Sequence, residues 1–136
     1  MNQQYSLLLH LNFQREMADF LGQFNESAKP LAKQQLATAL DKIRSNPFSE
    51  KALREISSKK LQGLIRRIHV GGPGRYRLFY LSPPNCTLII PFYISKERRS
   101  DFRYDSRTIE EIENAALPIF SDFVKNNHAQ FKNWSG

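Results

Sequence analysis

The sequence has one cysteine in 136 residues, Cys86, and no long apolar run. A lone cysteine excludes an intramolecular disulfide, and this favours a reducing compartment. The apolar patch from Leu7 to Leu9 is interrupted by His10, so it is too short for a signal peptide or a membrane span. We therefore expect a cytoplasmic protein.

Residue spacing typical of metal ligands is also missing. The chain has three histidines, none of them at a ligand spacing: His10, His69 and His128. No helical pattern follows the glycine-rich stretch at 71–74, which indicates a hairpin turn and not a phosphate-binding loop. The sequence predicts no metal and no other cofactor.

Acidic residues are scarce in the middle of the chain. Residues 59–107 hold eleven lysines and arginines against three acids, a net charge of +8, while the rest of the chain carries −1. Scattered charge would indicate a solubility surface. Charge this segregated attracts polyanions and favours a nucleic acid or an acidic protein partner.

The composition that is present, 40% apolar and 12% aromatic, is typical of one globular domain, here residues 1–136. The apolar pattern predicts strands over 5–11, 64–70, 75–81 and 87–95, and helices over 13–24, 30–45 and about 106–125. We expect a β-bulge or an unpaired N–H at Pro91, a kink or early end at Pro118, and a frayed tail.

The order β–α–α–β–β–β–α predicts an α+β fold. Short turns between the three central strands indicate antiparallel pairing. We therefore expect a curved antiparallel sheet with the N-terminal strand and a helical hairpin packed on one side, followed by a C-terminal helix.

Alternation along the strands assigns their faces. Arg67, His69, Arg77 and Phe79 are predicted to share an open face, opposite the apolar positions that pack under the helices: Ile68, Val70, Tyr76, Leu78 and Tyr80. Cations and aromatic rings on an open sheet face are typical of a surface that binds single-stranded RNA. Further candidates for RNA contact flank it: Arg66, Arg75, Lys96 and Arg99.

The strand Arg75-Tyr-Arg-Leu-Phe-Tyr80, between a glycine turn and an apolar strand with a basic loop, resembles the core of RelE-type toxins. The resemblance to this RelE/ParE superfamily covers about residues 60–104. It implies that Arg77 contacts the scissile phosphate and that Arg98 and Tyr104 match the family's arginine and tyrosine six residues apart. Arg67 and His69 fall where RelE has two lysines, so a histidine at this position is a departure.

This resemblance implies a toxin of a toxin–antitoxin system that cuts mRNA on the ribosome without a metal and is silenced by a cognate antitoxin. The five catalytic candidates supply the cations and the acid or base that such cleavage needs: Arg67, His69, Arg77, Arg98 and Tyr104. Two alternatives stay open: a ParE-like toxin that inhibits gyrase, and a non-catalytic RNA-binding domain on the same fold.

Overall fold

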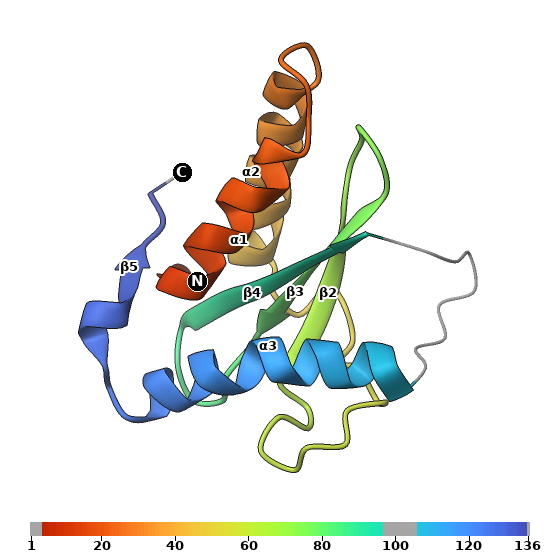
Figure 1. Ribbon diagram of the computed structural model, residues 1–136. Coiled ribbons are helices and arrows are strands. Elements are labelled where there is room, and N and C mark those ends of the chain that lie inside the picture. The colour runs from red at the N-terminus through yellow and green to blue at the C-terminus, as the bar shows by residue number, and fades with distance from the viewer. Residues whose placement is uncertain (1–3, 97–105, 136) are drawn as a thin grey trace.

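The computed structural model describes residues 4–96 and 106–135. Over these residues the chain forms an α+β fold, which confirms the predicted class (Figure 1). Its elements follow the predicted order, with one short strand added at the end: β1 (Ser6–His10), α1 (Leu11–Gly22), α2 (Lys29–Ser45), β2 (Ile65–Val70), β3 (Tyr76–Leu81), β4 (Leu88–Lys96), α3 (Ser106–Val124), a 3-10 turn (His128–Gln130) and β5 (Phe131–Asn133).

The strands form one sheet with the order β2-β3-β4-β1-β5. β2, β3 and β4 are antiparallel neighbours, as their short turns predicted. β1, which we expected to pack on one side of an antiparallel sheet, instead joins the sheet and pairs with β4 in parallel, with Ser6 opposite Leu88. A parallel neighbour needs a long crossover connection, and the helical hairpin with β2 and β3 provides it.

β5 adds to the free edge of β1 in antiparallel orientation, where we expected a frayed tail. Trp134 extends this contact, because its N–H donates to the carbonyl of Leu7 over 3.1 Å. The guanidinium carbon of Arg44 lies 5.2 Å from the centre of the indole ring. The expected fraying is therefore wrong for residues 131–134.

Helices cover both faces of the sheet (Figure 1). α1 and α2 pack on the face where Leu78 and Tyr80 are fully buried. α3 packs on the opposite face, over Phe79 and Leu81, so the prediction that this face is open is wrong. The physical reason is an apolar stripe on α3 that needs an apolar surface to cover it: Ile109, Ile112, Ala116 and Ile119.

Two prolines lie inside regular elements. Tyr80 opposes Pro91 and Phe79 opposes Tyr93, so β4 has one extra residue at this point. This β-bulge confirms the expectation for Pro91. Pro118 does not end α3, which continues to Val124. No helix among the residues described here is long and apolar enough to cross a membrane.

Candidate active site

Three of the candidate residues lie on one side of the β2–β3 hairpin. His69 is directly opposite Arg77, and Arg77 is directly opposite Ser95 of β4. Directly opposite side chains project from the same side of a sheet, with their Cβ atoms roughly 5 Å apart. Arg67 lies two residues before His69 and projects the same way. The predicted parity of the two arginines and the histidine is confirmed.

Arg67, His69 and Arg77 form a row on this side of the sheet, which we call the row at His69. The surroundings of this row differ from the prediction. His69 is exposed and Arg67 is half-buried, but Arg77 retains only 8% of its accessible surface. Phe79 is 1% exposed and packs beneath α3, with its ring centre 5.8 Å from that of Tyr93. A ring buried in this way cannot stack on an RNA base, so the role predicted for Phe79 is wrong. The pair of His69 and Arg77 marks the border between the covered and the exposed parts of this face.

Exposed cations lie at the same end of the sheet. Arg75 comes directly before β3, and Lys96 is the last residue of β4, opposite Tyr76. The Arg75 side chain can meet a polyanion that approaches the row at His69. Lys96 projects from the side of Tyr76, so it does not share the side of His69 and Arg77, and its contact with RNA remains a prediction. Three more candidates fall outside the residues that the structure describes, and their roles remain predictions: Arg98, Arg99 and Tyr104.

Arg66 lies on the other face of the sheet. It is opposite Tyr80, which is buried under α1 and α2. Its Nε donates to the hydroxyl of Ser82 over 3.0 Å, and its guanidinium carbon lies 4.8 Å from the centre of the Phe48 ring. Arg66 therefore does not join the row at His69. Alternation along β2 already implies this separation, because neighbouring residues of a strand point to opposite faces.

The row combines fixed positive charge with a side chain that exchanges protons. Arginine stays charged at all physiological pH values and presents a planar fork of donors that matches phosphate oxygens. Histidine is the side chain most often used as a general acid or base. Arginine and histidine side chains placed together can bind a phosphodiester and transfer a proton to or from it. In the described part of the chain, no three His, Cys, Asp or Glu side chains form a group that could hold a metal ion.

Sequence reasoning missed a partly buried contact between β1 and α3. The Nε2 of His10 donates to the Oδ2 of Asp122 over 2.7 Å, while the Nδ1 of the same ring accepts from the backbone N–H of Asn12 over 3.0 Å. Asp122 also accepts from the amide of Asn127 over 2.8 Å. The hydrogen bonds from His10 and Asn127 hold the pKa of Asp122 below its ordinary value. We assign the pair a structural role, because both ring nitrogens and both carboxylate oxygens are used within the fold.

The comparisons with known proteins find similarity among solved structures. No protein-family model matches the chain, and no curated protein matches it. Among solved structures, the chain is similar to a mutant of the E. coli toxin RelE in the free state, with 17% identity and a TM-score of 0.47. The match covers 73% of this chain and 90% of that one.

Proposed function

We propose that the protein is the toxin of a type II toxin–antitoxin system and an endoribonuclease that cleaves mRNA on the ribosome without a metal. The observation that carries this proposal is the placement of His69 directly across the sheet from Arg77, on the same side as Arg67. These residues belong to the segment of net charge +8. The strand from Arg75 to Tyr80 also has the sequence pattern of RelE-type toxins.

In the proposed reaction the 2′-hydroxyl of one nucleotide attacks its own 3′-phosphate. A bond forms between O2′ and phosphorus, and the bond from phosphorus to the 5′-oxygen of the next nucleotide breaks. A base takes the proton of the 2′-hydroxyl, and an acid protonates the leaving 5′-oxygen. The products are a 2′,3′-cyclic phosphate and a free 5′-hydroxyl, so no redox partner and no further reactant is needed.

Arg77 is proposed to stabilise the negative charge that develops on the phosphate. Its Cα lies in the middle strand of β2, β3 and β4, and its low exposure restricts its rotamers, which preorganises the guanidinium. Removal of one such preorganised donor ordinarily lowers a rate by roughly 10²–10³. Arg67 is proposed to contact the same phosphate or its neighbour, and Arg98 has the same task in the proposal.

His69 and Tyr104 are proposed as the groups that move protons. His69 is the exposed member of the row, so a substrate can reach it directly. Either residue can act as the base and the other as the acid, and the pH profile of cleavage would distinguish the two assignments. Arg75, Lys96 and Arg99 are proposed to hold the flanking RNA backbone.

An acidic segment of a cognate antitoxin is proposed to cover the basic residues and to extend against α1 and α2. Such binding should weaken as salt rises, because screening reduces the attraction between the two charged surfaces. A pull-down from the native host tests this partner. Recovery of no small acidic protein at low salt would contradict it.

The test of the enzyme is cleavage of a translated mRNA by the purified protein, with and without EDTA. We expect the same cleavage in both. His69→Gln should lose cleavage, whereas His128→Gln should keep it, because His128 is an exposed histidine in the 3-10 turn. Loss of cleavage in EDTA that a divalent cation restores would overturn the metal-free mechanism. RNA binding without cleavage would favour the non-catalytic alternative, and gyrase inhibition without cleavage would favour the ParE-like one.

A further inference from the structure

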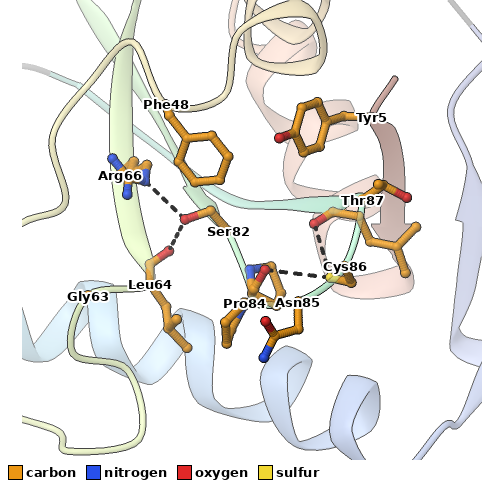
Figure 2. Close-up of a pocket in the computed structure, with 12 residues that line it drawn as sticks. Tyr5, Phe48, Gly63, Leu64, Arg66, Ser82, Pro84, Asn85, Cys86 and Thr87 are labelled. Atoms are coloured by element: carbon orange, nitrogen blue, oxygen red, sulfur yellow. Dashed lines mark hydrogen bonds between the residues drawn. The ribbon is translucent and has the colours of Figure 1, made fainter. Parts of the chain in front are cut away.

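A groove of about 820 Å³ lies where the β3–β4 turn meets the start of β2 (Figure 2). Twelve residues line it, among them Tyr5, Phe48, Arg66, Asn85 and Cys86. Its volume is within the range of small-molecule sites, roughly 300–1,000 Å³. The described residues of the candidate active site, Arg67, His69 and Arg77, do not line the groove.

Arg66 is the one charged side chain among the twelve described residues of this lining, and neutral groups hold it in place. Its Nε donates to the Ser82 hydroxyl, and its Nη1 donates to the backbone carbonyl of Glu50. The Ser82 hydroxyl donates in turn to the carbonyl of Leu64 over 3.3 Å. Within residues 4–96 and 106–135, no carboxylate forms an ion pair with Arg66 and no group accepts from its Nη2. A fixed guanidinium with an unused donor edge is suited to bind an anion such as a phosphate.

Two aromatic rings belong to the lining: Phe48 lies beside this guanidinium, and Tyr5 lies on the far side of Phe48 (Figure 2). Phe48 retains 52% exposure, which is high for a phenyl ring, and Tyr5 meets it edge-on at 5.9 Å and 71°. Exposed rings of this kind are platforms on which nucleobases stack. Because Arg66 already lies over Phe48, a ligand that bound here would meet a ring and a positive charge together.

After the guanidinium and the rings, the third feature of the groove is the side-chain amide of Asn85 in the β3–β4 turn. Asn85 is exposed, and its backbone lies in the left-handed region, with φ of 60°. Among the residues described, no hydrogen bond uses that amide, which leaves both donor and acceptor free for the edge of a base. The twelve described lining residues include no acidic side chain that would repel a phosphate.

We propose that this groove binds a nucleotide: Arg66 takes the phosphate, the rings of Phe48 and Tyr5 take the base, and Asn85 contacts the edge of the base. The nucleotide can be free or can be one unit of an RNA strand. This inference does not rest on the proposed ribonuclease, since the groove and the row at His69 share no residue.

Cys86, the one cysteine of the chain, is half-buried in the lining, so its reactivity can report whether a ligand occupies the groove. We would measure the rate at which a thiol reagent modifies Cys86 in the full chain, with AMP, GMP, CMP, UMP, ribose 5-phosphate or inorganic phosphate present. Nucleotides should slow the reaction in a saturable way, and the two compounds without a base should slow it far less. Equal protection by inorganic phosphate, or no protection by any nucleotide or oligoribonucleotide, would overturn the proposal.

A short RNA oligomer distinguishes the two sources of the nucleotide. Protection by mononucleotides at concentrations similar to those of the oligomer assigns the groove to a free nucleotide. Protection by the oligomer at much lower concentrations assigns it to a unit within a strand. Either result supports a nucleotide site, whatever the outcome of the cleavage assay.

Variants then test each contact by equilibrium dialysis of the protecting nucleotide. Arg66→Gln should weaken binding by about tenfold or more, since hydrogen bonds to charged groups are worth about 1.5–3 kcal/mol. Phe48→Leu should weaken it by about fivefold or more through the loss of stacking. Asn85→Gly suits the positive φ, so it should fold normally, keep phosphate binding and lose preference among the bases. Arg54→Gln is the matched control, because Arg54 is exposed and does not line the groove. An unchanged preference among the bases in folded Asn85→Gly, or an unchanged affinity in folded Phe48→Leu, would contradict the proposed base contacts.

Discussion

The imidazole of His10 and the carboxylate of Asp122 share a hydrogen bond of 2.7 Å that joins the end of β1 to the last turns of α3. The Nδ1 of His10 accepts from the N–H of Asn12, so the neutral ring carries its proton on Nε2 and donates it to the carboxylate. One side chain thus caps the start of α1 and holds α3 in place.

The first prediction concerns acid stability. The pKa of Asp122 is lowered in the fold by the hydrogen bonds of His10 and Asn127, so its stabilising contribution is present above the unfolded value of 3.8 and is lost as pH falls through the folded value. Asp122→Ala should lower the melting temperature at pH 7, and the difference from the wild type should shrink below about pH 4. Melting curves from pH 2 to 7 measure this. Glu110→Ala is the control on the same helix, since Glu110 is exposed. A difference that stays constant with pH would contradict the assignment.

The second prediction concerns the segment between α2 and β2, which Glu113 of α3 holds in place. Its Oε1 accepts from the backbone N–H of Ser57 over 2.7 Å and of Ser58 over 3.1 Å, and the Ser57 hydroxyl adds a bond of 2.9 Å. Burial raises the pKa of Glu113, but these hydrogen bonds outweigh it and hold the pKa below 4.5. Glu113→Ala should release the segment and speed tryptic cleavage after Lys59 and Lys60, which are exposed.

Glu113→Gln should stay closer to the wild type in this proteolysis, because an amide oxygen still accepts from both backbone groups. Mass spectrometry of the first fragments identifies the cut sites. Equal cleavage rates in the wild type and in Glu113→Ala would show that other contacts fix this segment.

The third prediction separates His69 from Arg77. His69 is exposed, so His69→Gln should change the free energy of unfolding by about 0.5 kcal/mol or less and lower cleavage by roughly 10²–10⁴. Arg77 is 8% exposed, so Arg77→Ala should cost roughly 0.5–3 kcal/mol of stability and also lower cleavage about a hundredfold.

Arg77→Lys should recover the melting temperature better than the activity, because an ammonium keeps the charge but loses the planar fork. Chemical denaturation and cleavage per folded molecule are measured on all three variants. Cleavage at the wild-type level in either folded alanine or glutamine variant would remove that residue from the mechanism.

The fourth prediction concerns Tyr80, whose hydroxyl donates to the carbonyl of Pro47 over 2.7 Å inside the fold. Burial raises the pKa of Tyr80 to about 12 from 10.0, so the neutral phenol stabilises the fold below pH 10, and this contribution is lost as pH rises toward 12. Tyr80→Phe should cost about 1–3 kcal/mol at pH 7, since it leaves a buried carbonyl without its donor. The cost should diminish above pH 10 in alkaline unfolding curves. Stability equal to the wild type at pH 7 would contradict this.

Local patterns in the sequence predicted the interior of the β2–β3 hairpin well. Alternation placed Tyr80 under the helical hairpin and His69 beside Arg77, because parity along a strand is set by the backbone alone. The same alternation separates Arg66 from Arg67, although the sequence-based assignment put both on the RNA-binding surface.

The errors arose where the partner of an element lies far away in the chain. Phe79 was assigned to an open face because nothing local shows that α3 returns to cover it. The pairing of β1 with β4 and β5 was missed for the same reason. β5 also has too few residues to show the alternation of apolar and polar side chains that indicates a strand. His10 and Asp122 carry no motif, so their contact follows only from the fold.

The position of β1 between β4 and β5 has a consequence for the kinetics of folding. The β2–β3–β4 meander closes through short loops, whose entropic cost is small. β1 must instead find β4 across the helical hairpin, and Leu8 must find Asn133 near the other end of the described chain. Contacts this distant in sequence raise the contact order and slow folding. Mutations in the meander should therefore alter the folding rate most, whereas mutations in β5 should chiefly alter the unfolding rate.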